Sequence, residues 1–246
     1  MLVVVGLFVR RTIPESPEFQ AVQRAGAQAT VPAAEALRGC WQQILLAMGA
    51  SCAQAGCVYV VTTFVLTYAT ESVGLPRQTV LLAVVLGGAV QLVGVPLFGA
   101  LSDQLGHRRV FLFGGAFAAL MAVPFFRLID AREPGLLVLA LIAGTLGPAA
   151  MYGPLGSLFA ALFRANVRYS GLSLGYQLGT VLAGGLSPLL ATLLLAASGG
   201  NPTPIGVYMI GLCLVSVACV LATSEQRRGP MERSHTAETV RQVSWS

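Results

Sequence analysis

Charged side chains are scarce in this chain: Asp, Glu, Lys and Arg make up 10% of its 246 residues, and Lys is absent. A soluble domain carries roughly 25% charged residues, whereas 55% of this chain is hydrophobic and its mean hydropathy is +0.75. This balance excludes a water-soluble globular domain, and the apolar content is too high for a disordered protein. The five cysteines lack a Cys-x-x-Cys spacing and lie mostly in apolar stretches. That pattern favours small core residues over metal ligands or disulfides.

Long uncharged stretches dominate the rest of the sequence. A helix needs about 20 apolar residues to cross the ~30 Å hydrocarbon layer, whereas strands of a membrane barrel would alternate polar and apolar residues. The last uncharged stretch is long enough for two helices and is divided by the Gly- and Pro-rich turn 198–204. The sequence therefore predicts an all-α membrane protein with six transmembrane helices, near residues 42–68, 79–101, 110–129, 136–162, 170–197 and 205–223.

The segments outside the six spans have a different character. Residues 1–9 are apolar but too few to cross a membrane, and Arg10 and Arg11 follow them, which is the reverse of a secretory signal. We interpret 1–9 as the remnant of a preceding transmembrane helix and 10–38 as a connector. The six-helix domain then occupies 39–223, and 224–246 form a charged tail.

Arginine positions predict the orientation. With six spans, twelve arginines fall on one side of the membrane and three on the other. The positive-inside rule places the richer side, with the connector and the C-terminus, in the cytoplasm of a cell (inner or plasma) membrane. Arginines beside anionic lipid headgroups account for the net charge of +5, so no nucleic-acid partner is needed. The three arginines on the other side are Arg77, Arg127 and Arg132.

Catalytic side chains are absent from the predicted spans. No Asp, Glu, Arg or His falls well inside any of them, although such residues usually mark proton relays or ion sites within membranes. An intramembrane enzyme would need clustered carboxylates, or a nucleophile with a positioned base. The sequence therefore argues against an enzyme and offers no catalytic residue, metal site or cofactor site.

A stripe of uncharged polar residues on the first span is a candidate cavity wall. Ser51, Gln54 and Thr62 fall within about 80° of one another on a helix of 100° per residue, with Tyr59 at the edge of the stripe. Such a stripe lines an aqueous cavity or makes hydrogen bonds between helices, and both interpretations stay open.

The fourth span contains two prolines, Pro148 and Pro154. Because proline removes a backbone donor and clashes one turn back, we expect this helix to bend or break. Broken helices are common at transporter binding sites, which makes Tyr152 a candidate substrate-cavity residue. A merely kinked structural helix is the alternative.

The fifth span begins with two overlapping Gly-x-x-x-Gly motifs. Their small residues predict close helix packing. Tyr176 and Gln177 lie beside this face and are further candidates for contacting a substrate. The packing residues are Gly171, Gly175 and Gly179.

The loop between the second and third spans reads Gly-Ala-Leu-Ser-Asp-Gln-Leu-Gly-His-Arg-Arg over residues 99–109. It resembles the cytoplasmic loop signature of the major facilitator superfamily, G-x-L-x-D-[RK]-x-G-[RK]-[RK], with Gln104 and His107 in place of the usual basic residues. A glycine helix end and a tight turn hold a carboxylate at the membrane surface, where it can meet a helix N-terminus or an Arg. A plain charged loop that only sets topology is the alternative. The resemblance implies a gating loop formed by Gly99, Asp103, Gly106, Arg108 and Arg109.

Two further stretches narrow the resemblance. Residues 11–19 are similar to the segment after the sixth helix of the metabolite:H+ symporter family, and residues 168–179 with 184–188 are similar to that family's helix eleven. Family members usually have Asn at the position of Gln177. The resemblance covers helices seven to twelve of a twelve-helix transporter and the end of helix six.

The resemblance implies proton-coupled symport of a small metabolite, a carboxylate or zwitterion, by alternating access between two six-helix halves. The implied partners are the lipid bilayer, the substrate and proton, and a separate N-terminal half or a second copy of this chain. Two other interpretations stay open. The chain could be a truncated, inactive fragment, or it could be a non-transporting membrane subunit that docks on a partner through its glycine face.

Overall fold

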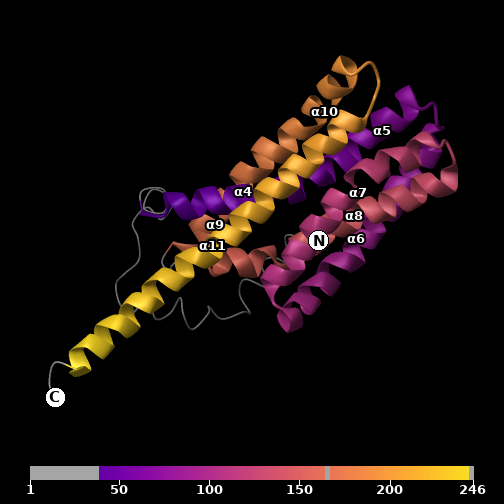
Figure 1. The fold of residues 1–246 in the computed structure, drawn as a ribbon. Helices are drawn as coiled ribbons and strands as arrows, with labels where there is room; N and C mark the ends of the chain where they lie inside the picture. The colour runs from indigo at the N-terminus through magenta and orange to yellow at the C-terminus, as the bar shows by residue number, and fades with distance from the viewer. Residues whose placement is uncertain (1–38, 164–166, 244–246) are drawn as a thin grey trace, which may run out of the picture.

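The structure, a computed structural model, describes residues 39–163 and 167–243, with side chains up to residue 223. The predicted helix remnant 1–9 and connector 10–38 lie outside the described residues. The described chain forms a bundle of six long apolar helices (Figure 1), which confirms the predicted all-α membrane fold. The six spans are Trp41–Ser72, Arg77–Leu105, His107–Asp130, Pro134–Ala160, Arg168–Ala197 and Thr203–Thr223.

Two of the spans change helix type along their length. The first and fifth spans contain π-helical segments, labelled η, between α-helical ones, and the last helix continues beyond the body of the bundle (Figure 1). The elements are α4 (Trp41–Tyr59), η1 (Val60–Phe64), α5 (Val65–Thr67), η2 (Tyr68–Ser72), α6 (Arg77–Leu105), α7 (His107–Asp130), α8 (Pro134–Ala160), α9 (Arg168–Gly179), η3 (Thr180–Gly185), α10 (Leu186–Ala197) and α11 (Thr203–Val243).

Glycine and proline set the helix ends. Gly106 has a φ of +95° between α6 and α7, a conformation that other residues adopt only with strain. Pro134 occupies the first turn of α8, where its missing N–H costs nothing. Gly199 and Gly200 also have positive φ, and Asn201 Oδ1 accepts a hydrogen bond from the Thr203 N–H at the start of α11. The Gly/Pro turn predicted between the last two spans is therefore present.

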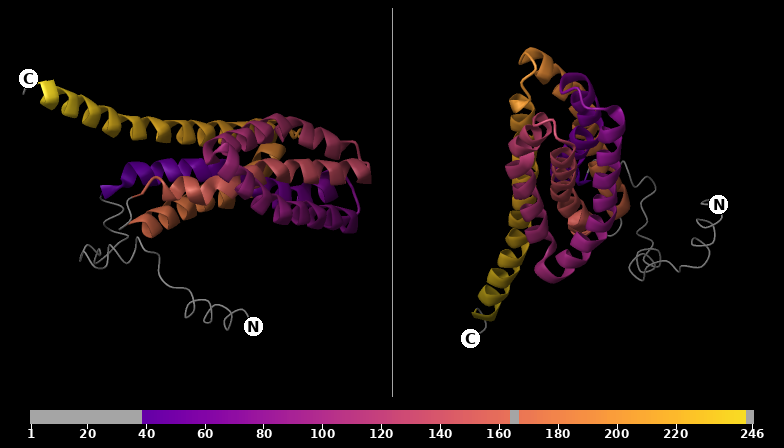
Figure 2. Two further views of the ribbon diagram at one scale, coloured as in Figure 1. Left: turned by 90° about the horizontal axis from the view of Figure 1, so that it is seen from below. Right: turned by 90° about the vertical axis from the view of Figure 1, so that its right-hand side faces the viewer.

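The order of packing differs from the order along the chain. α8 packs against both α6 and α7, and α7 packs against α11. α11 also packs along α4, which in turn contacts α9 and η3. Figure 2 shows the resulting bundle from two further directions. α4, α7, α8 and α11 therefore form the interior of the bundle, with α6 and the α9–α10 span at its flanks.

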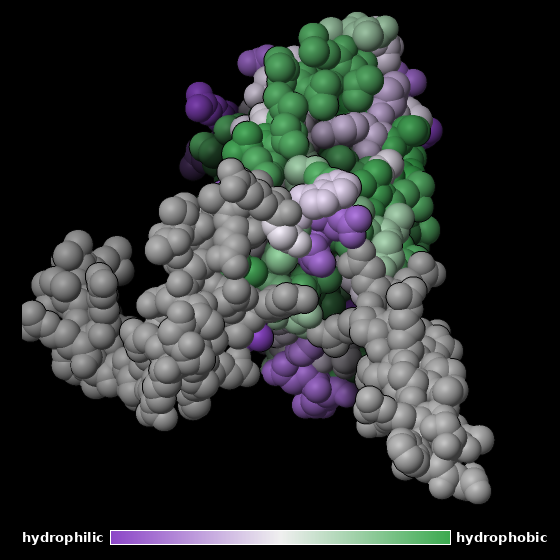
Figure 3. Space-filling model, turned by 90° about the vertical axis from the view of Figure 1, so that its left-hand side faces the viewer, coloured by the Kyte–Doolittle hydropathy of each residue, from purple (hydrophilic) through white to green (hydrophobic). Residues whose placement is uncertain are grey.

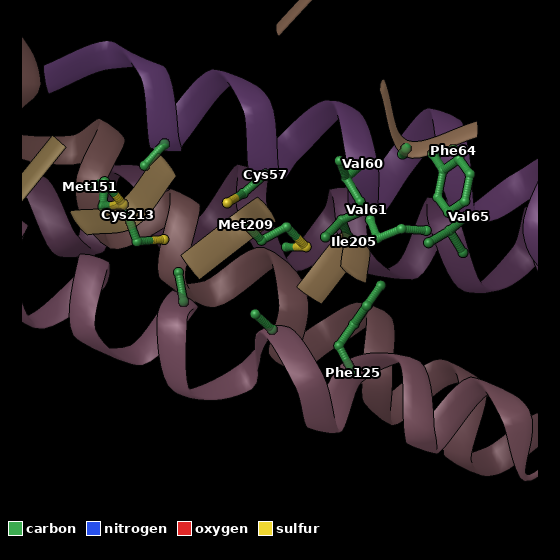
Figure 4. Packing of buried hydrophobic residues seen from close by; sticks show 14 of the residues in the cluster. Cys57, Val60, Val61, Phe64, Val65, Phe125, Met151, Ile205, Met209 and Cys213 are labelled. Carbon is green, nitrogen blue, oxygen red and sulfur yellow. The ribbon is translucent and has the colours of Figure 1, made fainter. Parts of the chain in front are cut away.

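Large buried side chains fill the space between these helices. Figure 4 shows Val60, Val61 and Phe64 of the first span lying near Phe125 of α7 and Ile205 of α11. At the end of this cluster, the Tyr68 hydroxyl donates a 2.5 Å hydrogen bond to Asp130 Oδ1, and its ring lies edge-on to Phe126. The core thus joins the first span to both α7 and α11.

Glycines bring α8 close to both of its neighbours. A Cβ added to Gly153 would lie 2.7 Å from the Gly99 N atom on α6, and one added to Gly147 would lie 2.8 Å from the Ala118 Cβ on α7. Small residues of this kind let membrane helices approach closely. α8 also continues through Pro148 and Pro154 without a break. Packing on both sides accounts for that continuity, because neighbouring helices hold a proline-containing helix in place.

The two flanking spans leave most of their surface open. In the most apolar stretch of α6, and equally in that of the α9–α10 span, only 22% of the residues are buried, against 67% in the first span. Hydrophobic residues cover much of the described surface seen in Figure 3, while a group of hydrophilic residues lies at the lower end of that view. The open apolar surface fits a lipid or protein environment rather than water.

Candidate functional site

Three tyrosines from three different spans gather on an open part of the bundle. Tyr152 of α8 and Tyr176 of α9 have ring centroids 6.3 Å apart, and the ring of Tyr59 of α4 lies against Gly184, on the same span as Tyr176. Tyr59 and Tyr152 are each 41% exposed, and Tyr176 is partly exposed. We refer to these three residues as the tyrosine cluster. It combines hydroxyl groups with aromatic faces that a small molecule can reach.

Glycine at position 184 makes room for the tyrosine cluster. A Cβ added to Gly184 in η3 would lie 2.9 Å from the Tyr59 ring, so any larger residue would displace that ring. Thr180, at the start of η3, is buried at its Oγ1 and also neighbours Tyr176. The π-helical segment of the fifth span therefore forms part of the support of the cluster.

The remaining cavity candidates are divided between surface and interior. Gln177 is exposed beside Tyr176 on α9. Thr62 is half-buried, and its hydroxyl donates to the Val58 carbonyl oxygen at 2.7 Å. Ser51 is fully buried and donates to the Ala47 carbonyl oxygen at 2.6 Å, and Gln54 is 6% exposed with its Oε1 unpartnered among the described residues. Ser51 and Gln54 thus lie within the helix packing, where Ser51 faces Gly179 of α9.

The glycines of the fifth span do not all contact the same element. A Cβ on Gly175 would lie 2.6 Å from the Ala47 Cβ, and one on Gly179 would lie 2.6 Å from the Met48 carbonyl oxygen, so both face α4. Gly171 instead faces the ring of Phe163, just beyond the end of α8. Two of the three predicted packing glycines therefore hold α9 against α4.

The loop 99–109 places its charged residues in different surroundings. Asp103 is exposed, and its carboxylate lies 3.9 Å from His107 Nδ1. Ser102 donates to the Gly99 carbonyl oxygen at 2.6 Å, so its single proton is used and the His107 Nδ1–H donates to the Ser102 oxygen at 2.9 Å. Arg108 reaches across to α11, where its Nη2 donates to the Leu221 carbonyl oxygen at 3.3 Å.

Several residues at these sites were not predicted from the sequence. Thr180 and Gly184 support the tyrosine cluster, and a signal was available in Pro188, which lies one turn after Gly184 and deprives its carbonyl group of a helical donor. Ser102 could not be identified from the sequence, because its hydrogen bond with His107 depends on the turn at Gly106. Among the described residues, no group of three or more His, Cys, Asp or Glu side chains lies together in a way that could hold a metal ion.

Six apolar spans around a tightly packed interior, with a charged turn at one end, define a multi-pass membrane protein. The chain belongs to the Major Facilitator Superfamily, which it matches over residues 1–184 and 44–244. This confirms the resemblance carried by the loop 99–109.

Several characterised relatives are transporters. The shikimate transporter of Escherichia coli (strain K12) is 31% identical over 231 residues, 93% of this chain and 53% of that protein. The proline/betaine transporter of the same strain is 26% identical over 241 residues, 93% of this chain and 47% of that protein. The citrate-proton symporter of Klebsiella pneumoniae is 28% identical over 227 residues, 90% of this chain and 50% of that protein.

The chain spans about half the length of these curated relatives. No solved structure matches it significantly. The relatives are transporters rather than enzymes, so the comparisons agree with the transporter class that the loop predicted.

Proposed function

We propose that this chain is the C-terminal six-helix half of a secondary active transporter that carries a small carboxylate or zwitterion together with a proton. Relatives named for shikimate, proline and betaine, and citrate with a proton support this substrate class. The similarity of residues 168–188 to a late family helix supports the assignment to the C-terminal half. The chain then works as a multi-pass protein of the cell membrane.

The tyrosine cluster is the observation that carries the proposal. A phenol hydroxyl can donate to a carboxylate, and an aromatic face attracts an ammonium or quaternary ammonium group. Tyr59, Tyr152 and Tyr176 offer both on one exposed surface drawn from three spans. Gln177 beside them adds an amide donor and acceptor. These groups would form one wall of the substrate passage.

A second six-helix half would supply the opposite wall. Exposing an unpaired polar group such as the Tyr152 hydroxyl to lipid costs free energy. The tyrosine cluster therefore needs a polar or protein surface opposite it. Proton coupling needs a titratable group reached alternately from each side, and the described spans carry no Asp, Glu or His near mid-membrane. The proton-binding groups would therefore belong to the other half, which a separate chain or a second copy would provide.

The experiment is uptake into proteoliposomes with a proton gradient. Radiolabelled shikimate, proline, betaine and citrate are offered to the chain alone and to the chain co-expressed with the N-terminal half of a related symporter. We expect saturable uptake of at least one of them only in the paired sample. Tyr152→Ala should lower that uptake roughly tenfold, the rate equivalent of about 1.4 kcal/mol of lost aromatic and hydrogen-bond contact.

Two controls separate the site from the scaffold. Tyr152→Phe keeps the ring and removes only the hydroxyl, and Tyr169→Ala removes an exposed tyrosine on α9 outside the cluster. Tyr169→Ala should leave uptake unchanged. Gradient-driven uptake by the chain alone, without a cross-linked dimer, would overturn the half-transporter proposal. Failure of every pairing to transport any substrate would favour an inactive fragment or a non-transporting subunit.

A further inference from the structure

The start of α7 concentrates positive charge. The first turn of this helix carries His107, Arg108 and Arg109, has no acidic residue, and has no side chain capping its free N–H groups. A helix N-terminus is already partially positive, so basic residues there are unfavourable unless an anion is bound. The nearby carboxylate of Asp103 lies 3.9 Å from His107, and neither arginine forms an ion pair with an acidic side chain that the structure describes.

These residues surround a pocket. It has a volume of about 470 Å³ and lies between the start of α7, the end of α8 and α11. Leu105, Leu158 and Leu162 give it an apolar wall, and Ser157 adds a hydroxyl donor. None of the described residues that line it is acidic. We refer to it as the cationic pocket.

Arg108 has unused hydrogen-bonding capacity at this pocket. Its Nη2 is held by the Leu221 carbonyl oxygen, which fixes the guanidinium group at the pocket wall. Its Nε–H is buried and has no acceptor in the part of the chain that the structure describes. A buried unpaired donor of a charged group is costly, and an anionic oxygen in the pocket would satisfy it.

An apolar groove continues from the cationic pocket between α6 and α7. Its volume is about 350 Å³, and it shares Leu105 and Arg109 with the pocket. Phe98, Leu101 and Phe113 form its walls, and Phe113 is 61% exposed. Along α6 the groove runs from Phe98 to Leu105, seven helical steps or about 10 Å. It lies on the flank of the bundle that the fold leaves open.

We propose that the cationic pocket and this groove together bind one anionic phospholipid, with its phosphate at Arg108 and Arg109 and an acyl chain along Phe98, Leu101 and Phe113. Charge complementarity selects the anion, and the adjoining groove selects a lipid over a free phosphate, which would have no use for an apolar channel. Basic pockets between membrane helices on the arginine-rich side commonly hold such headgroups. In the proposed orientation the lipid belongs to the cytoplasmic leaflet.

Native mass spectrometry of the purified full chain, released from detergent with added lipid, tests the proposal. Phosphatidylglycerol and phosphatidylcholine with the same acyl chains are offered at equal concentration. We expect preferential retention of phosphatidylglycerol. Arg109→Gln, at an exposed residue with no hydrogen bond between its side chain and the described chain, should reduce that preference roughly fivefold, and the double variant Arg108→Gln/Arg109→Gln should reduce it further.

Matched controls exclude a general charge effect. Arg127→Gln, at the other end of α7, should keep the preference, whereas Leu101→Gln in the groove should weaken retention of phosphatidylglycerol more than Leu97→Gln, which lies on the same helix outside the groove. Equal retention of the two lipids, or an unchanged preference in Arg109→Gln, would overturn the proposal. Displacement of the lipid by glycerol phosphate at equal concentration would show an anion site without a lipid. None of these readouts depends on transport, so they stand apart from the test of the proposed function.

Discussion

At the scale of single residues, Ser216 is the clearest example of a contact that the fold creates. Its side chain is fully buried on α11. Its hydroxyl donates to the Gly49 carbonyl oxygen at 2.7 Å and accepts from the Ala53 N–H at 2.9 Å, two groups that would otherwise pair within α4. One serine therefore inserts into the hydrogen-bond ladder of a neighbouring helix and joins α4 to α11.

Removing this hydroxyl should destabilise the bundle moderately. Hydrogen bonds between membrane helices contribute about 0.6 kcal/mol on average and up to ~2 kcal/mol. Because Gly49 and Ala53 can still pair with each other, we expect Ser216→Ala to cost about 1 kcal/mol. Thermal unfolding of the protein in mild detergent measures this change. Ser173→Ala, at an exposed position on α9, is the matched control and should leave the midpoint unchanged; an equal midpoint for both variants would contradict the bridging role.

Asp103 should matter for transport and not for the stability of this chain. Its carboxylate is exposed and makes no described contact closer than the 3.9 Å approach to His107. If it pairs with a helix terminus of the other half in one state, Asp103→Asn removes roughly 0.3–1 kcal/mol of bias, a two- to fivefold change in a gating equilibrium. Uptake by the paired halves should fall by that factor, with an unchanged thermal midpoint. Unchanged uptake would leave the loop as a topology signal.

The sequence predicted which residue types form the candidate site, but it predicted only some of their positions in the fold. The stripe on the first span grouped Ser51, Gln54 and Thr62 by helical angle alone, with Tyr59 at its edge. In the structure α4 is packed by α11 along one side and α9 along another, so Ser51 and Gln54 are buried, whereas Thr62 is half-buried and Tyr59 is exposed. Helical angle gives relative direction, and only the tertiary packing decides which directions are covered.

At the scale of elements, the irregular helices are not where the prolines predicted them. α8 continues through both of its prolines, whereas the first span contains two π-helical segments without any proline. There Thr62 and Thr70 each donate to the carbonyl oxygen four residues earlier, at 2.7 Å, a contact that bends helices. In η3 the cause is Pro188, and Ser187 donates to the Ala183 carbonyl oxygen. Thr145 in α8 and Thr192 in α10 make the same contact within regular α-helix, so threonine position alone does not predict a π-helical segment.

The contact between α6 and α8 gives a sharp test at this scale. A Cβ at Gly153 would lie 2.7 Å from the Gly99 backbone, whereas a Cβ at Gly156 on the same helix meets nothing within 4 Å. Both Gly→Ala changes gain up to about 1 kcal/mol of helix propensity. Gly153→Ala should still destabilise the protein, by about 1–3 kcal/mol of overpacking, while Gly156→Ala should be neutral or stabilising. Thermal unfolding of the pair in detergent measures the difference, and equal midpoints would contradict close packing at Gly153.

At the scale of the whole molecule, composition and charge were sufficient for the fold class. The number of spans follows from the lengths of the uncharged stretches, and each span begins and ends within a few residues of the predicted limits, since charged and Gly/Pro residues mark both the membrane surface and the helix ends. The packing order was not predictable, because α4 and α11 come from opposite ends of the described chain. α6 and the α9–α10 span remain the most open flanks of the bundle.

The orientation of this bundle in the membrane is the last prediction. Twelve arginines on one side against three on the other predict that the turn at Gly106 and the C-terminal end of α11 face the cytoplasm. Single cysteines are introduced at Gln104, Glu133 and Asn201, all exposed in helix-end or loop positions, in a background without the five native cysteines. A membrane-impermeant maleimide added to intact cells should label positions 133 and 201 and should label position 104 only after permeabilisation.

Because each position is exposed whichever way the bundle inserts, burial does not explain a missing label. Labelling of position 104 in intact cells, with 133 and 201 protected, would invert the orientation and move the proposed lipid site to the outer leaflet.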